Sequence, residues 1–481
     1  MIWLAVCIVH LRRGEYTPSA LLVWGCCVSA SPVPAPSTIE ATTIRKLRLR
    51  ILPFVFVLYV IAYLDRINIG FAALTMNKEL AISSQQFGFL AGIFFFGYFI
   101  FEVPSNLLLH RIGARIWIAR ILITWGVVAV LTGFVQTPHQ LYFVRFILGL
   151  AEAGYFPGIV LYLTYWFRQR EQAQAIALFM AAVPITSIVG APISGLILDH
   201  VHWLGLSSWR WLLILEGVPA VVGGFLTYLL LPNRPVEAKF LTQKEKDWIS
   251  SELAREERQK LAKRRISAVQ VFTNGRVWHL ICVGFAFFIS VYTLNFWMPQ
   301  LVKSLFARYS NSIIGILVMI PSVAGLLAMV LVSRRSDRKL ERRYHAAVPA
   351  IIGGLALLSV GATRSAWLSL ALLCFGAAGV YSFYAPFYSL PCEFLTGFSA
   401  ASGIAFISSV AHLGSFVGPY AMGAINKRTG SFRGGLVLAG SSLFASAMLI
   451  LALRQRIAPE IEPIATARRS PVVLPTPDID S

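Results

Sequence analysis

The chain has 481 residues, of which 57% are hydrophobic and 13% charged, and its mean hydropathy is +0.69. About a quarter of the residues in a soluble domain are charged, so this composition excludes an ordinary soluble enzyme, a disordered protein and a disulfide scaffold. The formal net charge is +20, from 42 Lys and Arg against 22 Asp and Glu. Membrane proteins collect such a surplus in their cytoplasmic loops. We therefore interpret the chain as an integral membrane protein, with no need for nucleic acid to explain its charge.

A regular hydropathy pattern begins at residue 51. It predicts twelve helical spans, each with about the 20 apolar residues that a bilayer-crossing helix needs. The predicted spans are 51–73, 86–108, 116–136, 139–160, 174–197, 211–231, 277–299, 312–332, 345–363, 366–389, 399–423 and 433–453. The expected domains are a disordered or mis-started extension (1–44), a first six-helix half (45–231), a cytoplasmic linker (232–276), a second half (277–455) and a cytoplasmic tail (456–481).

Basic residues predict the topology. They are concentrated before the first span, in the loops around 111–115 and 334–343, in the 232–276 segment and in the tail, whereas the opposite loops hold few. The basic side is cytoplasmic, so both termini and the central segment are predicted to face inward, in a bacterial inner membrane. Within the central segment, residues 241–265 alternate in charge at helical spacing, which is typical of a surface helix. A solvated linker helix is favoured over a partner-binding one.

The two halves repeat each other at a nearly constant separation. The matching features are the span starts Ile51 and Val277, the basic loops that begin at Asn106 and Ser333, and Gly190 and Gly418 in glycine-rich spans. Two parallel six-helix repeats related by an axis along the membrane normal are the layout of rocker-type secondary transporters. A substrate would then bind at mid-depth between the halves.

Five sequence motifs carry a family resemblance. They are YLDRINIGFA (63–72), GYFIFEVPSNLLLHRIGAR (97–115), RFILGLAEAGYFPG (145–158), WRWLLILEGVPA (209–220) and SDRKLERR (336–343). Over about 45–455 the chain resembles the major facilitator superfamily, and within it the anion:cation symporter family of organic-acid transporters. The resemblance implies an all-α membrane fold of twelve transmembrane helices in two pseudo-symmetric halves. His110 and Leu340 depart from the superfamily's loop motif, where aspartate and glycine are usual.

Four charged residues lie clearly inside the predicted spans: Asp65, Arg66, Arg145 and Glu152; Glu102, Arg120 and Glu216 lie within or near span ends. A charge in the hydrocarbon core is costly and indicates function by default. Arg145 and Glu152 are two turns apart on one helix face. Asp65 and Arg66 are sequence neighbours that diverge around their helix, so Asp65 is predicted to pair with Arg145 or with another helix. Asp65 and Glu152 are the proposed proton-coupling residues, and Arg66 and Arg145 the anion-binding residues, as in the family. The alternative is that these charges are interhelical pairs that stabilise the bundle.

Polar and aromatic residues complete the predicted site. The predicted substrate-binding set adds Tyr63, Tyr98, Tyr292, Asn295, Tyr388, Ser408 and His412. Tyr63 and Tyr98 match positions that line the cavity in the family. The family usually has Asn at 408 and 412 and Trp at 388, and these departures leave the usual substrate in doubt. Gating or latch roles are predicted for Glu102, Arg111, Arg115, Asp337 and Arg338.

These observations predict proton-coupled uptake of a small organic anion, such as a sugar acid, a tartrate-like acid or an aromatic carboxylate. Sodium stays open as the coupling ion. The alternative is a drug or metabolite exporter that exchanges protons. A membrane receptor would need a signalling domain, for which the linker and tail leave no room. The chain shows no nucleophile elbow, Walker loop or metal-ligand cluster, so it is predicted not to be an enzyme and to hold no cofactor or metal. We expect a monomer in the lipid bilayer.

Overall fold

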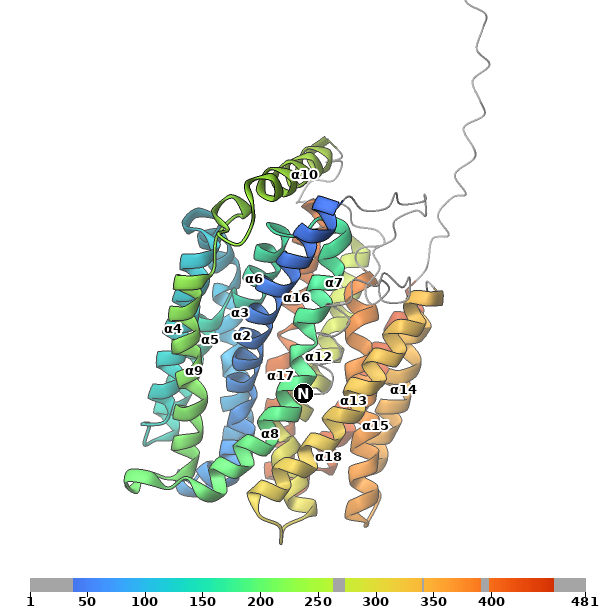
Figure 1. The fold of residues 1–481 in the computed structure, drawn as a ribbon. Coiled ribbons are helices and arrows are strands. Elements are labelled where there is room, and N and C mark those ends of the chain that lie inside the picture. The colour runs from blue at the N-terminus through green and yellow to red at the C-terminus, as the bar shows by residue number, and fades with distance from the viewer. Residues whose placement is uncertain (1–37, 263–272, 340, 391–397, 454–481) are drawn as a thin grey trace, which may run out of the picture.

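The computed structural model describes residues 38–262, 273–339, 341–390 and 398–453, and apart from short connections these residues are helical (Figure 1). The helices before the linker are α2 (Thr38–Glu79), α3 (Ser84–Ile112), α4 (Ala114–Thr132), α5 (Pro138–Glu152), α6 (Tyr155–Thr164), α7 (Gln169–Met180), α8 (Ala182–His200) and α9 (Ser208–Leu230). The linker contains α10 (Gln243–Ala262). After it come α12 (Gly275–Leu305), α13 (Asn311–Lys339), α14 (Arg343–Val360), α15 (Ala366–Ser389), α16 (Phe398–Ala411), α17 (Gly414–Thr429) and α18 (Arg433–Ala452).

The membrane-spanning helices agree with the hydropathy pattern. Within the described residues, 11 helices are long and apolar enough to cross a membrane. Two of them are composites, α5 with α6 and α7 with α8. The remaining predicted span, 399–423, is formed by the two shorter helices α16 and α17. The prediction of an all-α fold with twelve membrane spans is confirmed, while the expected extension below residue 38 and the tail beyond residue 453 lie outside the described residues.

Three predicted spans are interrupted rather than continuous. The break between α5 and α6 is at Ala153 and Gly154, directly after the buried Glu152, and Gly154 has a φ of 84°. A Cβ at Gly154 would also lie 2.3 Å from the Ser105 hydroxyl, so only glycine fits there. The other breaks are at Ala181 and at the residues between α16 and α17. Broken helices at mid-membrane depth are typical of transporter binding sites.

The first helix begins earlier than the predicted span. Helix α2 starts at Thr38 instead of residue 51, because its amphiphilic first turns extend beyond the apolar stretch and are held there by ion pairs. Glu40 in the first turn of α2 contacts Arg168, 2.9 Å away, and Arg170. The expected extension over 1–44 therefore ends in a helix, and its last residues belong to the bundle.

The linker helix α10 lies across the same end of the bundle as the start of α2 (Figure 1). Lys46 of α2 forms a 2.9 Å ion pair with Glu245 near the start of α10. Burial raises the pKa of the Glu245 carboxyl, but Lys46 and Thr242 outweigh this effect and hold the pKa below its ordinary value. A lowered pKa means that the contact is lost only as the pH falls through that value. The Glu245 carboxyl is therefore charged at neutral pH, and its ion pair with Lys46 is intact.

Arg168 is the centre of the contact between α10 and the bundle. Its guanidinium is buried, contacts the Glu171 carboxylate at 2.6 Å and lies 3.8 Å from Glu252 of α10. The same guanidinium is 4.8 Å from the ring centre of Trp248, also on α10. One side of α10 is thus docked on the bundle, in contrast to a freely solvated linker.

Arg168→Ala is expected to release α10 from the bundle, because it leaves Glu171 and Glu252 without their shared buried partner. Limited proteinase K digestion of the purified protein, whose cleavage does not depend on Lys or Arg, should then cut within α10 several times faster than in the wild type. The matched control is Arg255→Ala, which removes a different partner of Glu252, one that is 65% exposed. Exposed ion pairs contribute little, so the control should be cut at the wild-type rate. Equal digestion of both variants would contradict the docking role of Arg168.

The helices before and after the linker pack on each other mainly through α3 with α17, α8 with α13, and α2 with α12, and α3 also contacts α16. We call the end of the bundle opposite α10 the distal end; it carries the loops 80–83, 133–137, 201–207, 306–310, 361–365 and 430–432. There, Ser84 donates a 2.6 Å hydrogen bond to Asn426, and Asn77 donates one of 3.4 Å to Gln300. The distal end is therefore joined across the two sets of helices.

The strongest distal contact is a carboxylate at the start of a helix. Asp199, in the last turn of α8, accepts hydrogen bonds from the backbone amides of Asn311 and Ser312 at 3.1 and 2.7 Å. It also accepts from the Asn311 amide side chain at 2.9 Å and the Ser312 hydroxyl at 2.7 Å. These groups form the N-terminus of α13, where free N–H groups and the helix dipole favour a negative charge. Asp199 thus fastens α8 to α13.

Candidate functional site

An ion pair lies buried in the first half of the bundle. The Arg66 guanidinium of α2 donates to the carboxylate of Glu152, the last residue of α5. Arg66 is 6% exposed and Glu152 is fully buried. Breaking such a pair by removing one partner leaves an uncompensated buried charge, which costs about 3–5 kcal/mol. The pair therefore persists only while both groups are charged.

Aromatic rings surround Arg66. Its guanidinium carbon lies 5.4 Å from the ring centres of Phe94 and Tyr98 and 5.9 Å from that of Tyr63. Arg66 also donates a 3.4 Å hydrogen bond to the Tyr292 hydroxyl of α12. We call Arg66, Glu152, Tyr63, Tyr98 and Tyr292 the arginine cage. Because Tyr292 belongs to the second half, the cage joins both halves of the bundle.

Asp65 has different partners from those of Arg66. Its carboxylate accepts hydrogen bonds from the Trp125 indole of α4 and, at 3.1 Å, from the Asn68 amide. Arg145 interacts with Asp65 and Glu152 electrostatically, but no hydrogen bond joins it to either within the described residues. The sequence predicted that Asp65 pairs with Arg145 or with another helix. In the structure its hydrogen-bond partner on another helix is Trp125 of α4.

Arg145 is the more deeply buried arginine. It is 1% exposed, and its guanidinium carbon lies 5.2 Å from the ring centre of Phe94. Its Nε and Nη2 atoms have no hydrogen-bond partner within the described part of the chain. Buried guanidinium donors are rarely left unpaired, so the donors of Arg145 beside Phe94 are available to a further hydrogen-bond acceptor. Phe94 is also the ring beneath Arg66, so the two arginines share one aromatic surface.

Three predicted residues of the second half, Tyr388, Ser408 and His412, form a separate hydrogen-bonded chain. The Tyr388 hydroxyl is 3.5 Å from the Ser408 hydroxyl, which is 3.4 Å from Nδ1 of His412. The same Nδ1 donates a shorter hydrogen bond, of 2.6 Å, to the backbone carbonyl of Ser408. The His412 ring stacks on Phe288 with a centroid distance of 4.1 Å, at the break between α16 and α17. It lies 6.4 Å from the ring of Tyr98 in the arginine cage. Tyr388 and Ser408 therefore reach the cage through His412, whereas Tyr292 is itself part of it.

The predicted gating residues are not gathered in one place. Glu102 of α3 accepts a hydrogen bond from Ser409 of α16, so it joins the two halves. Arg115 donates its backbone amide to Asn233 at 3.0 Å, in the α3–α4 loop region near the end of α9. Arg111 and Arg338 are exposed, and the side chain of Asp337 lies outside the described residues. Among the described side chains of this set, Glu102 contacts the other half of the bundle.

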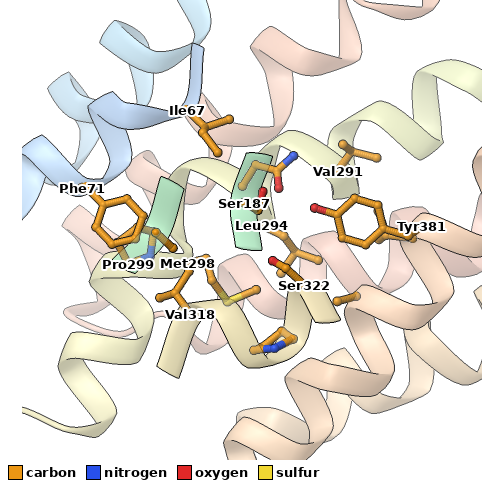
Figure 2. Close-up of a pocket in the computed structure, with 15 residues that line it drawn as sticks. Ile67, Phe71, Ser187, Val291, Leu294, Met298, Pro299, Val318, Ser322 and Tyr381 are labelled. Atoms are coloured by element: carbon orange, nitrogen blue, oxygen red, sulfur yellow. The ribbon is translucent and has the colours of Figure 1, made fainter. Parts of the chain in front are cut away.

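A pocket lies between the halves, with α2 and α8 on one side and α12, α13 and α15 on the other (Figure 2). Its space, including the part open to solvent, is about 530 Å³, and apolar side chains such as Phe71 form most of its wall. Polar groups come from Ser187, Asn295, Ser322 and Tyr381. Asn295 also donates a 3.1 Å hydrogen bond to Tyr63, so the pocket adjoins the arginine cage.

Several residues of the site were not predicted from the sequence. Trp125 and Asn68 hold Asp65, and Tyr381 lines the pocket with Ser187. Asn68 could have been found, because it follows Asp65 at i+3 on one helix face. Trp125 and Ser187 carry no such signal, since most aromatic and small residues in spans serve helix packing.

Comparison with known proteins decides the family. The family model described as Major Facilitator Superfamily matches residues 55–419. The chain belongs to the major facilitator superfamily. Its members are transporters, so the prediction that the chain is not an enzyme is confirmed, and it is a multi-pass membrane protein.

Individual relatives agree with this assignment. The chain is 43% identical over 424 residues to a protein of Agrobacterium vitis named "Putative tartrate transporter", covering 88% of this chain and 97% of that one. It is 37% identical to the "Quinolone resistance transporter" of Acinetobacter baumannii, covering 82% and 91%. Among solved structures, the partially occluded inward-open xylose transporter XylE of E. coli superposes with a TM-score of 0.70 at 14% identity, covering 85% and 98%. That likeness shows the fold.

Proposed function

We propose that this major facilitator takes up a small organic anion together with protons by alternating access. The main support for this proposal is the arginine cage, in which Arg66 of the buried Arg66–Glu152 ion pair also contacts Tyr292 of the other half. Planar guanidinium groups bind carboxylates in a bidentate way and stay charged. An anionic substrate and Glu152 are thus alternative partners for the same guanidinium.

The coupling follows from charge balance. A proton on Glu152 neutralises the carboxylate and releases Arg66, which then binds the substrate carboxylate. Arg145, with its unpaired donors beside Phe94, supplies a second contact to the same anion. Departure of the substrate leaves Arg66 to attract Glu152 again, and the proton leaves. Because binding of the two ligands is linked, each must strengthen the other by the same factor. Asp65 is the second proposed proton site, and Na⁺ is the alternative coupling ion.

The remaining predicted residues would position the substrate. Tyr63, Tyr98 and Tyr292 enclose the carboxylate end, while Asn295 connects the cage to the neighbouring pocket. The hydrogen-bonded chain of Tyr388, Ser408 and His412 would contact hydroxyls or a second carboxylate. The pocket between the halves would hold the body of the acid. The relative named as a tartrate transporter supports a small organic acid as substrate.

A second candidate function is export of a bulky apolar compound in exchange for protons. The largely apolar wall of the pocket and the relative named as a quinolone resistance transporter favour it. The buried arginines count against a cationic cargo, because a cation would have to displace or repel them. Anion uptake therefore explains more of the site.

The orientation in the membrane is part of the proposal. We propose that the end of the bundle carrying α10 is cytoplasmic, because the loops there hold the basic residues. The linker over 232–276 then connects the halves 45–231 and 277–455 on the inner face, and the distal end faces outward. The bacterial relatives support an inner membrane, and a monomer contains the whole proposed site. Glu102, Arg111, Arg115, Asp337 and Arg338 would act in the transition between states.

Asp199→Ala is expected to shift the protein toward a state that is open at the distal end. Loss of a helix cap costs about 1 kcal/mol, which is roughly a fivefold change in the equilibrium. Spin labels at Gln136→Cys and Arg364→Cys, both in exposed distal loops, should report a larger population at long distance once the native cysteines are replaced. Ser84→Ala, which removes one hydrogen bond at the same end, should shift the distances less. An unchanged distance distribution in Asp199→Ala would contradict the fastening role.

Transport into proteoliposomes tests the proposed function. Vesicles with an alkaline interior are supplied with radiolabelled galactonate, tartrate or phthalate, or with a cationic dye. Accumulation of one acid that collapses with a protonophore is the expected result. Movement of the dye with no acid transported would favour the exporter. Accumulation that follows a sodium gradient instead would replace the proton as coupling ion.

A further inference from the structure

A carboxyl outside the arginine cage is buried without a basic partner. Glu216, in α9, is 3% exposed and lies eight residues, about 12 Å, from the distal start of its helix. The Ser194 hydroxyl of α8 donates a 2.8 Å hydrogen bond to its Oε1 atom. Its Oε2 atom has no hydrogen-bond partner within the described residues, and no ion pair joins it to a Lys or Arg there. A packing role alone does not require a carboxyl at this position.

Glu216 lies beside the Asp65 group. Its carboxyl interacts electrostatically with Asp65, and the Asn68 side chain, which donates to Asp65 at 3.1 Å, is next to both. Helix α9 packs on α2, α8 and α4. Of these, α2 supplies Asp65 and Asn68, and α8 supplies the neutral Ser194.

The charged residues of α4 are remote from Glu216. A Cβ on Gly217 would contact Ala129 of α4 at 3.0 Å, which fixes the level of Glu216 along that helix. Arg120 is nine residues from Ala129, roughly 13 Å toward the other end. Asp65 is therefore the charged side chain that faces Glu216.

The charges of this region balance only if Glu216 is neutral. Asp65 and Glu152 are matched by Arg66 and Arg145, with which they interact. A third carboxylate would be buried without compensation, at a cost of several kcal/mol. Two neighbouring carboxyls that cannot both ionise hold one proton between them. Because Arg66 and Arg145 compensate Asp65 and Glu152, charge balance assigns that proton to Glu216.

We propose that Glu216 and Asp65 form a carboxyl pair that shares one proton, with Glu216 as a further proton-carrying residue of the transport cycle. When Asp65 is protonated and loses its attraction to Arg145, Glu216 can give up its proton, so the total charge of the pair is unchanged. Asp65 takes its proton from the side on which substrate enters, and Glu216 releases its proton to the other side, so one O–H bond forms as one breaks. Transfer of the remaining proton from Asp65 back to Glu216 resets the pair, and one proton has crossed the membrane. This proposal depends on the proton-coupled transport proposed above.

The test compares Glu216→Gln with the wild type in proteoliposomes. The probe is the acid of the galactonate, tartrate and phthalate panel that the wild type accumulates. Glutamine keeps the hydrogen bond to Ser194 but cannot release a proton. We expect substrate binding within about twofold of the wild type, a pH profile of uptake displaced by about one unit or more, and fewer protons moved per substrate. An unchanged pH profile and proton ratio would overturn the proposal.

Two further variants separate this role from a structural one. Glu216→Asp keeps an ionisable group and should restore the wild-type proton ratio with a displaced pH profile. Ser194→Ala removes only the hydrogen bond and should keep the proton ratio. If Glu216→Gln does not fold, a Glu216→Asp protein with the wild-type pH profile would overturn the proposal. If the wild type itself moves no protons, proton coupling fails as a whole; if the wild type couples and Glu216→Gln is unaltered, only the pair is wrong.

Discussion

Glu152→Gln is expected to abolish pH-driven accumulation of the substrate while leaving exchange of substrate across the membrane partly intact. Glutamine is a permanent neutral substitute for the protonated carboxyl, so Arg66 stays available to the anion but no longer loses it to a returning carboxylate. Accumulation should fall at least tenfold in proteoliposomes with an alkaline interior. Counterflow of labelled substrate, which needs no proton movement, should persist.

The fold must be checked in the same variant. Removing one partner of a buried pair costs about 3–5 kcal/mol, and this could lower the thermal stability of the purified protein. Glu79→Gln is the matched control, because Glu79 pairs with Arg210 at the distal end, outside the site. The control should accumulate substrate normally. Full pH-driven accumulation by Glu152→Gln would remove Glu152 from the coupling mechanism.

Arg66→Lys is expected to weaken substrate binding by roughly 30-fold, although it keeps the positive charge. Lysine loses the planar fork that binds a carboxylate through two hydrogen bonds and the flat face that rests against Phe94 and Tyr98. Hydrogen bonds to charged groups contribute about 1.5–3 kcal/mol, and about 2 kcal/mol corresponds to this factor. Substrate affinity is measured by isothermal titration of the purified protein.

Arg210→Lys is a suitable control, because Arg210 is another arginine that pairs with a glutamate and packs on an aromatic ring. Arg210 also pairs with a glutamate and lies 4.3 Å from the ring centre of Trp209, but it is at the distal end. Arg210→Lys should bind substrate as the wild type does. Wild-type affinity in Arg66→Lys would show that only the charge matters, and would contradict bidentate binding at the cage.

Hydropathy and charge predicted the positions of the spans, because a helix that crosses the apolar core of the bilayer needs a long stretch with few charged residues. The breaks within three spans were missed for a physical reason. Gly154, with its positive φ, offered a local signal, whereas Ala181 keeps right-handed helical backbone angles and offered none. The start of α2 was placed too late because its first turns are held by Arg168 and Arg170 rather than by lipid.

The residue types of the candidate site were predictable, but their pairing was not. Charges inside spans identified Asp65, Arg66, Arg145 and Glu152 directly. Which carboxylate meets which arginine depends on how the helices are rotated about their axes, and spacing along one helix does not report that. The sequence assigned Arg66 to the anion and Glu152 to the proton, whereas the structure pairs the two side chains. In the proposed mechanism, this pairing is the competition between Glu152 and the substrate for Arg66.

The predicted gating residues differ in whether the structure gives them contacts. Arg111 and Arg338 belong to recognisable loop motifs, yet both side chains are exposed here. Glu102, by contrast, contacts Ser409 across the halves.

The most direct test of proton coupling is the interior pH of proteoliposomes during substrate addition. Vesicles loaded with the dye pyranine and having no imposed gradient are given the acid that the wild type accumulates from the galactonate, tartrate and phthalate panel. Proton-coupled uptake predicts acidification of the interior that starts with substrate addition and is absent in Glu152→Gln. Substrate entry with a constant interior pH, in the presence of the intact Arg66–Glu152 pair, would contradict it.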